Sequence, residues 1–433
     1  MNFVRSVINW HKTTDLYENS VLAKEYDRRQ NRTIMMYQKL LYTISGSTVP
    51  DNYSANYKLC SNFFQRMIIQ QNQYLLGNGI EWNDPDTAEA LGDDFDTQVQ
   101  HAGHEALVSG VAFGFWNFDH LEVFTPREFA PLYDEENGSL SAGVRFWQID
   151  DTKPLRATLY ELDGYTDYIW RNGQKPAILH PKRAYILTRQ ISIADGEEII
   201  DGKNYPSFPI VPLWGNENHQ SELIGIQQEI DAYDLIRSGF ANDLDDASQI
   251  YWTIQNAGGM DDIDLVEFVH RMKTIKAAAV TDDTARAESH TLEVPYASRE
   301  ALLTRLRSDI YEDFMSLDTK NIASGATTAT QIKAAYEPLN NKTDMFEYCV
   351  IEFLQGILSL AGIEDDPTFN RSVIINAQEE IQTLVAASTY LDSEYITRKI
   401  LSILGDADKA DEVMGRIESD SLDRAAGVDL EQE

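Results

Sequence analysis

The sequence is poor in cysteine and has no long apolar run, and both absences exclude classes of protein. Only two cysteines occur among 433 residues, Cys60 and Cys349, far apart and without other ligands at metal-like spacing. They indicate neither a disulfide framework nor a zinc site, so we expect both in the core. No apolar stretch approaches the roughly 18 residues that span a bilayer, and residues 1–10 lack the order of a secretory signal. We therefore expect a protein that is assembled in the cytosol and enters no membrane.

Basic side chains are also scarce. Lysine and arginine number 36 against 70 aspartates and glutamates, which gives a formal net charge of -34. Conventional DNA-binding domains gain affinity from basic residues that neutralise phosphates, so this balance argues against one. It does not argue against a surface past which DNA moves, because an acidic wall repels the phosphate backbone. Solubility alone is the simpler interpretation of the charge, and it stays open.

Motifs for nucleotide and metal chemistry are missing or incomplete. No Gly-x-x-x-x-Gly-Lys-Ser/Thr loop occurs, which excludes an ATP-driven motor of that type. Gly110 and Gly114 do not open a helix after a predicted strand, as a dinucleotide-binding motif requires. The best metal candidate is His101, His104 and Glu105, but its order differs from His-Glu-x-x-His and no further ligand is evident. We therefore predict a protein that is not an enzyme and holds no metal or cofactor, with a metal-dependent hydrolase as an alternative.

The residues that are present predict an α+β fold. Apolar residues recur at helical spacing through the first 75 residues, including Ile34 to Leu41 and 56–76, and again over 94–110. Segments rich in aromatic and β-branched residues follow, separated by turn formers, which is typical of an antiparallel meander. These predicted strands are 129–133, 144–149, 157–162 and 165–170.

Two long amphipathic helices are predicted in the second half, over 221–247 and 298–316. Pro206, Pro209 and Pro212 mark an extended crossing into the first of them. Short strands are predicted between the two helices, at 250–254, 277–280 and 290–294.

A loop and further helices complete the chain. Small and polar residues fill 317–328, and a helix is predicted over 329–360. Pro338 must kink or interrupt that helix, because proline lacks the N–H group and clashes with the preceding turn. Weaker helical patterns cover 377–387 and 392–404, and the acidic composition from Asp406 onward indicates a disordered tail.

Two runs of residues resemble the portal proteins of long-tailed bacteriophages. Phe208-Pro209-Ile210-Val211-Pro212-Leu213-Trp214, followed by Ser221-Glu222-Leu223 and Ile230-Asp231-Ala232-Tyr233-Asp234, is similar to the start of the first stem helix in that family. Ser324-Gly325-Ala326-Thr327-Thr328-Ala329-Thr330-Gln331-Ile332-Lys333, ahead of a helix that contains proline, resembles the tunnel loop and tunnel helix. The runs also occur in the family's order, and the resemblance is clearest from 205 to 362.

The resemblance implies a portal fold and a division of the chain into its parts. These would be an α/β wing at 1–220, the first stem helix at 221–247, a β-rich clip at 248–297, the second stem helix at 298–316, the tunnel loop at 317–328, a kinked tunnel helix at 329–362, and a helical crown with an acidic tail at 363–433.

The resemblance also implies a function. The chain would form a homo-oligomeric ring of about twelve subunits at one vertex of the capsid in the virion, assembled in the host bacterial cytoplasm. Double-stranded DNA would pass through the ring during packaging, retention and ejection. The partners would be the terminase large subunit, the capsid and scaffold proteins, and later the head-tail adaptor. Another ring-forming head or neck protein is the alternative within the same class.

Candidate site residues follow from these assignments. Lys320 is the one basic residue between Tyr311 and Gln331, so we predict that it contacts phosphate in the channel. An ordinary surface lysine remains the alternative, and simple loop chemistry is an equal alternative for the other loop positions. Those candidate DNA-facing positions are Asn321, Ser324, Thr327 and Thr328. On the second long helix, Arg299, Arg305 and Arg307 are predicted to form ion pairs between subunits.

Overall fold

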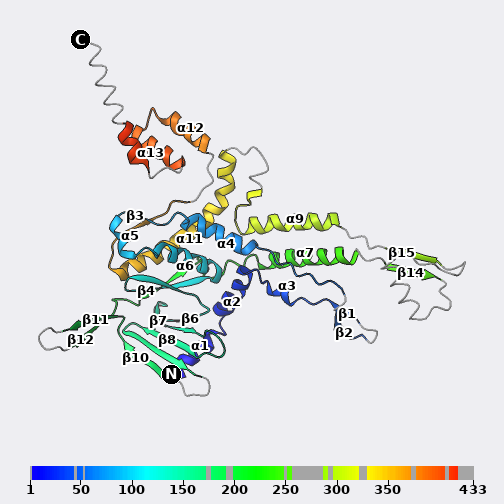
Figure 1. The fold of residues 1–433 in the computed structure, drawn as a ribbon, viewed down its shortest axis with the longest axis horizontal. Coiled ribbons are helices and arrows are strands. Elements are labelled where there is room, and N and C mark those ends of the chain that lie inside the picture. The colour runs from blue at the N-terminus through cyan, green and yellow to red at the C-terminus, as the bar shows by residue number, and fades with distance from the viewer. Residues whose placement is uncertain are drawn as a thin grey trace, which may run out of the picture.

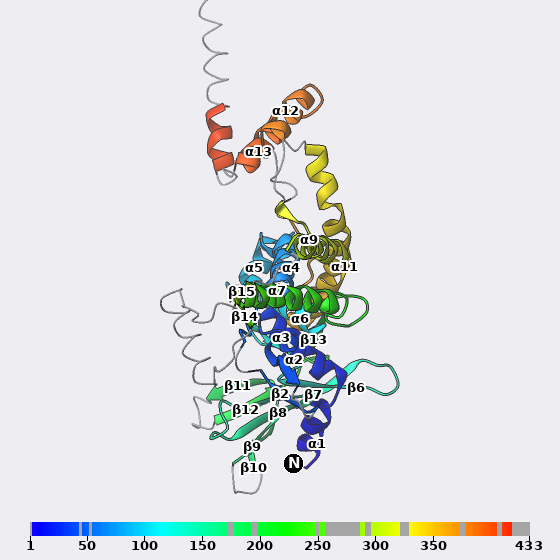
Figure 2. The same ribbon diagram turned by 90° about the vertical axis from the view of Figure 1, so that its right-hand side faces the viewer.

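The computed structural model describes residues 2–42, 46–51, 54–171, 177–191, 198–247, 251–255, 286–290, 296–320, 329–371, 377–404 and 409–417. A central body carries a five-stranded sheet on one side, and a pair of long helices projects from it (Figure 1). The C-terminal helices lie on the side of the body opposite the five-stranded sheet, as a second view also shows (Figure 2). The fold class is α+β, as the sequence predicts.

The N-terminal part is helical, but it contains a projecting pair of strands. The helices are α1 (Asn2–His11), α2 (Asp15–Asp27) and α3 (Arg32–Met36). The chain then forms β1 (Leu40–Tyr42) and β2 (Thr48–Pro50), which pair only with each other. The helical pattern predicted through Leu41 is therefore wrong after Met36. The three apolar residues at 40–42 are too short a run to distinguish a helix from a strand, and in the structure they form β1.

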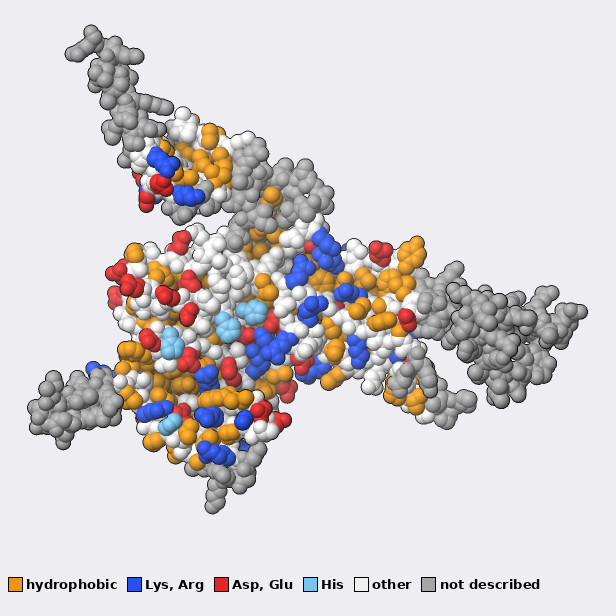
Figure 3. All heavy atoms as spheres, in the orientation of Figure 1, with side chains coloured by type: hydrophobic (Ala, Val, Ile, Leu, Met, Phe, Trp, Pro, Cys, Tyr) orange, Lys and Arg blue, Asp and Glu red, His pale blue; other side chains and the backbone are white. Residues whose placement is uncertain are grey.

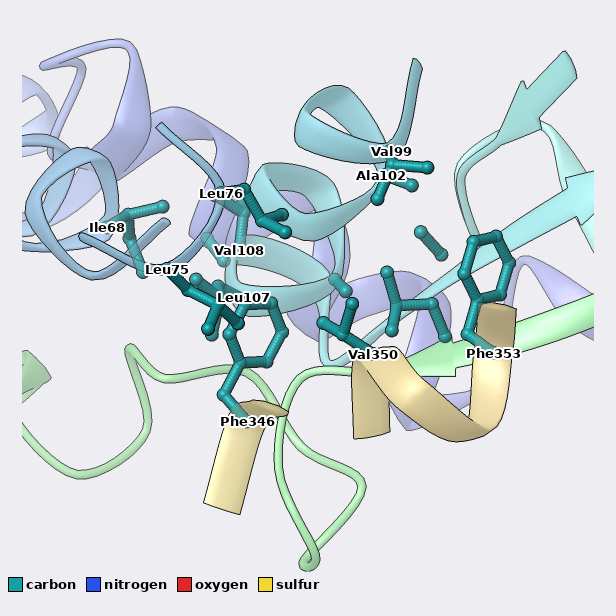
Figure 4. Packing of buried hydrophobic residues seen from close by; sticks show 14 of the residues in the cluster. Ile68, Leu75, Leu76, Val99, Ala102, Leu107, Val108, Phe346, Val350 and Phe353 are labelled. Carbon is teal, nitrogen blue, oxygen red and sulfur yellow. The ribbon is translucent and has the colours of Figure 1, made fainter. Parts of the chain in front are cut away.

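The main core joins segments that are distant in sequence. It is built from α4 (Phe63–Leu76), α6 (Phe95–Ser109) and α11 (Ala329–Ala361), packed against the three-stranded sheet β13-β4-β5. The strands are β4 (Val111–Asn117), β5 (His120–Phe124) and β13 (Ile210–Trp214). Phe346, Val350 and Phe353 extend from α11 toward the apolar side chains of α4 and α6 (Figure 4). All three are at most 1% exposed, so α11 is an integral part of the body.

Glycines fix two features of α6. Gly110 ends the helix with φ 88°, a left-handed conformation that glycine adopts without the Cβ penalty. Gly103, in the middle of the His101 to Glu105 segment, lies so close to α4 that a Cβ would stand 2.4 Å from the Asn72 amide oxygen. This part of the sequence is therefore shaped by helix packing.

The meander that the sequence predicts is present. The order β10-β9-β8-β7-β6 is antiparallel throughout, and α1 packs on it through Val4, Val7 and Ile8. Aromatic side chains fill the space between this sheet and the three-stranded sheet, among them Phe113, Phe129 and Tyr160. The five strands are β6 (Phe129–Tyr133), β7 (Leu140–Trp147), β8 (Leu155–Glu161), β9 (Gly164–Trp170) and β10 (Ala177–Arg183).

Two small strand pairs and one short helix complete the body. One pair is the hairpin of β11 (Ile186–Ile191) and β12 (Glu198–Lys203). The other joins β3 (Glu81–Trp82) to β16 (Pro367–Thr368), with α5 (Pro85–Leu91) beside it. Acidic side chains gather over β3 and α5, whereas lysine and arginine concentrate where α2 meets the long helices (Figure 3).

The projecting helices are α7 (Gln227–Ala247) and α9 (Tyr296–Asp313). Beyond them lie β14 (Tyr251–Gln255) and β15 (Arg286–His290), which pair antiparallel. The sequence predicts these elements, but α7 begins six residues later than expected, and the last predicted strand is β15 rather than 290–294. The predicted strand at 277–280 lies outside the described residues.

The C-terminal helices agree closely with the sequence pattern. The sequence predicts that Pro338 kinks or interrupts this helix. α11 runs through Pro338 as one helix, so an interruption does not occur, and the ribbon of α11 bends between its yellow and its gold part (Figure 1). α12 (Ala377–Ala387) and α13 (Ser393–Leu404) follow. Residues 410–417 are helical, so the predicted disorder after Asp406 does not apply to them. No helix among the described residues has the length and apolar character needed to span a membrane.

Candidate functional site

The α7–α9 pair is anchored in the body at the start of α7. The Ser221 hydroxyl donates to the Val108 carbonyl at 2.6 Å, which joins the approach to α7 directly to α6. The Leu223 N–H in turn donates to the Ser221 Oγ, and the Leu223 and Ile226 side chains are 2% exposed in the main core. The two long helices therefore extend from a fixed base.

A polar ladder on α7, which sequence reasoning missed, holds an extended segment along the helix. Asp234, Ser238 and Asn242 are four residues apart and so share one face. Their side-chain oxygens accept backbone N–H groups of Ser61, Leu59 and Tyr57, at 2.8, 3.0 and 2.6 Å respectively.

The ladder residues are buried, at 0%, 6% and 5% exposed. Asn31 adds a second connection, because its side-chain amide donates to Asp231 at 2.8 Å and to Asp234 at 3.2 Å. Burial raises the pKa of Asp234, and the hydrogen bonds from Ser61 and Asn31 oppose that rise. The four-residue spacing of these short polar side chains could have predicted a polar face on α7, but the sequence prediction used only the apolar residues of that helix.

The three predicted interface arginines all have carboxylate partners within their own chain. Arg299 pairs with Asp243 of α7, and its guanidinium stands 5.9 Å from the Phe240 ring. Arg305 pairs with Asp309 one turn along α9 at 2.8 Å. Arg307 reaches Asp318 beyond the end of α9 at 2.8 Å. In the single chain these arginines brace α9, and their role between subunits stays a prediction.

The connection after α9 is held at its root. Met315 adopts φ 62°, a left-handed conformation that is uncommon for a residue other than glycine. Gln70 on α4 then clamps Leu317 in both directions: its amide nitrogen donates to the Leu317 carbonyl at 3.1 Å, and its oxygen accepts the Leu317 N–H at 3.0 Å. The start of the predicted loop is therefore fixed to the body.

Lys320 is the last residue of the described segment 296–320. Its side chain is exposed, and its backbone N–H donates to the Asp318 carboxylate at 3.1 Å. The other predicted loop residues, Asn321, Ser324, Thr327 and Thr328, lie outside the described residues. The structure thus places Lys320 one turn beyond a fixed point and leaves its predicted contact with DNA untested.

Lys342 on α11 connects the end of α9 to the approach to α7. Its ammonium group pairs with Glu222 at 2.5 Å and donates to the Phe314 carbonyl at 3.0 Å. It also stands 3.3 Å from the centre of the Phe314 ring. Burial lowers the pKa of Lys342, and the Glu222 carboxylate opposes that effect. These groups line a cleft of about 210 Å³. The clasp is made by charged residues far apart in sequence, so no local pattern could predict it.

His104 and Glu105 belong to a network of buried and half-buried ion pairs, whereas the His101 side chain is exposed. Glu105, 4% exposed, pairs with Lys24 at 2.7 Å and with Arg127 at 2.6 Å. Burial would raise the pKa of Glu105, but the two cations hold it below its ordinary value. His104 faces Asp27 at 3.3 Å. Among the described residues no group of three or more His, Cys, Asp or Glu could hold a metal ion, so the hydrolase alternative finds no support in them.

Comparison with known proteins agrees with the resemblance seen in the sequence. The family model described as "Phage portal protein, SPP1 Gp6-like" matches residues 7–424. The portal protein of Clostridium phage phiCD119 is 25% identical over 385 residues, which cover 80% of this chain and 81% of the relative. The portal protein of Bacillus phage SPP1 is 22% identical over 395 residues, covering 81% and 74%.

Two solved structures share a weaker likeness. One is the neck of an empty GTA particle computed with C6 symmetry, with a TM-score of 0.44, 10% identity and coverage of 79% of this chain and 90% of the other. The second is the virion of a native gene transfer agent particle, with a TM-score of 0.44, 11% identity and coverage of 78% and 89%.

Proposed function

Because the chain belongs to the family of phage portal proteins of the SPP1 Gp6-like type, we propose that it builds the ring-shaped channel of a capsid vertex. The observation that carries the proposal is the family match over residues 7–424, which includes both long helices. The role is structural, and the proposed work is to let double-stranded DNA pass during packaging, to retain it, and to release it at ejection.

We assign the parts of the chain as follows. The body up to residue 220 is the wing, α7 and α9 are the stem helices, and β14 with β15 belongs to the clip. The connection at 317–328 is the tunnel loop, α11 is the tunnel helix, and residues 363–433 form the crown and tail. The side-by-side stem helices with strands beyond them support this division (Figure 1).

The proposed assembly is a ring of about twelve copies related by rotation. Its clip docks the terminase large subunit first and the head-tail adaptor later, and its wing contacts capsid and scaffold proteins. The ring is assembled in the host bacterial cytoplasm and remains in the virion. Arg299, Arg305 and Arg307 would also meet carboxylates of the neighbouring copy. The exposure of Arg305, 76% beside Asp309, supports this for that residue.

Electron microscopy of the purified protein tests the ring directly. We expect particles with rotational symmetry, about a dozen subunits and a central channel near the width of a DNA duplex. A uniform population of monomers or dimers, at concentrations where related rings assemble, would contradict the proposal. Class averages along the ring axis then count the subunits.

A further inference from the structure

The arm formed by residues 35–42 and 46–51, which carries β1 and β2, exposes more apolar surface than its position in one chain explains. Met36 is 72% exposed, Leu41 40% and Val49 42%. Leu41 and Val49 are direct cross-strand partners, so they form one apolar pair on a face of the ribbon. The other exposed apolar side chains of the arm are Met35, Tyr37 and Leu40.

Such an arm needs a partner to be stable. A single two-stranded hairpin is marginally stable in water, because neither strand has a second neighbour and little surface is buried. Its free edges and exposed apolar pairs also favour association with other chains. The arm projects beside α7 in Figure 1, and neither strand joins another sheet of the described chain.

The two ends of the arm are nevertheless fixed to α7. Asn31, before the arm, bonds to Asp231 and Asp234, and Tyr57, after it, bonds to Asn242. The Lys58 ammonium closes the root by donating to the Met35 carbonyl at 2.5 Å. The polar ladder therefore holds the arm at a defined place along α7. Because both ends of the arm are ordered within the subunit, less conformational entropy is lost when the arm binds a partner.

The arm carries no excess of negative charge, unlike the chain as a whole. Its described residues contain one lysine, Lys39, and one acidic residue, Asp51, in a chain with a formal net charge of -34. α7 is acidic, with six acidic residues and one arginine, and it exposes Leu235 and Leu244. A neutral arm with exposed apolar side chains can therefore pack on the exposed leucines of this acidic helix without adding negative charge to it.

We propose that the arm of each subunit packs on α7 of the next copy and clasps neighbouring subunits together. This inference rests on the proposed ring. Rotation about a ring axis leaves every atom at its own height along that axis, so an arm that lies beside its own α7 meets the neighbouring α7 at the same level. Because the arm and α7 are different surfaces, the contact is head-to-tail and closes into a ring.

The apolar side chains distinguish this partner from DNA. Methionine, tyrosine and arginine are enriched at protein interfaces, whereas a phosphate-binding arm needs cations and gains nothing from exposed Met36, Leu41 and Val49. A protein surface is therefore the occupant that the arm fits.

Photo-crosslinking identifies the partner. A benzoylphenylalanine placed at Tyr37 is expected to form a covalent dimer in assembled rings, with the crosslinked peptide from residues 227–247. A mixture of isotope-labelled and unlabelled protein shows that the two peptides come from different copies. Crosslinking to added duplex DNA instead, or only to other peptides, would overturn the inference.

Matched variants measure the contribution of the arm. Met36→Asp with Leu41→Asp adds negative charge opposite the acidic α7 and is expected to weaken subunit association about tenfold or more. Ile149→Asp with Leu162→Asp alters two exposed apolar residues of the meander and is expected to leave association unchanged. Circular dichroism establishes that both variants fold, and sedimentation measures assembly.

The outcomes separate the two proposals. If the unaltered protein forms no ring, the proposed function fails, and the arm inference fails with it. If the unaltered protein and the arm variant form rings equally well, the arm inference alone is wrong.

Discussion

At the scale of single residues, Glu229 has a carboxyl group whose pKa is raised in the folded chain. It lies at the root of α7 and faces Asp313 of α9. Burial first, and then hydrogen bonding to Asp313, raise its pKa to about 7. Two carboxyl groups that share a partly desolvated site disfavour a second negative charge, so the folded chain keeps a proton there.

This shift predicts a stability that depends on pH. In the unfolded chain Glu229 ionises near its ordinary pKa of 4.5, whereas the folded chain keeps the proton until about pH 7. Between these values the folded state binds more protons, so the contribution of Glu229 to stability falls as pH rises and then stays constant. Glu229→Gln removes this titration. We expect the difference in melting temperature between the variant and the original protein to grow in favour of the variant from pH 5 to pH 7.5.

Thermal unfolding over that pH range measures the melting temperature of both proteins. Their difference at each pH removes the contributions of carboxylates that titrate alike in the two proteins. Glu312→Gln is the matched control, because Glu312 lies on α9 and its side chain is exposed. A Glu229→Gln difference that stays constant with pH would show that Glu229 is ionised in the folded chain.

At the scale of elements, Lys342 of α11 connects the end of α9 to the approach to α7. The Glu222 and Lys342 side chains are 11% and 12% exposed, so removing one leaves the other charged and poorly solvated. We expect Lys342→Met to lower the free energy of unfolding by roughly 2–4 kcal/mol, since breaking a buried pair costs more than the pair contributes. Lys342→Met combined with Glu222→Gln is expected to recover most of that loss.

Denaturant unfolding measures both variants. Lys333→Met is the matched control, because Lys333 is exposed on the same helix and a surface change of this kind is expected to stay within about 0.5 kcal/mol. Equal losses in the single and double variants would mean that the clasp does not depend on the charge of Glu222.

Sequence reasoning succeeded where one element follows one pattern. The bounds of α12 match the prediction, and the meander strands agree within a few residues, because apolar periodicity and turn formers specify them locally. It failed at Leu40 and Leu41, where a short apolar run does not distinguish a helix from a strand. Sequence reasoning also could not predict the hydrogen bond from Ser61 to Asp234 or the ion pair of Lys342 with Glu222, because these contacts join residues more than 100 positions apart.

At the scale of the whole molecule, the charge is unevenly distributed. A formal net charge of -34 per chain would make the proposed ring of about twelve copies a strongly negative assembly, which disfavours general binding of duplex DNA. Figure 3 nevertheless shows lysine and arginine concentrated near the body, where α7 begins and α9 ends, and over α2. Basic side chains of the body are in part already paired within the chain, such as Lys24 and Arg127 with Glu105. Contact with DNA is therefore expected to depend on few residues.

The affinity of assembled rings for duplex DNA tests this expectation. Each phosphate neutralised by a basic side chain adds about -0.9 to the slope of log affinity against log salt concentration. Because Lys320 is the one basic residue in the predicted loop, Lys320→Ala is expected to reduce the magnitude of the slope and weaken binding equally for all DNA sequences. Lys333→Ala, the control, is expected to leave the slope unchanged. Fluorescence anisotropy across a salt series gives both slopes, and a steep slope that survives Lys320→Ala would assign the phosphate contacts to basic residues outside the loop.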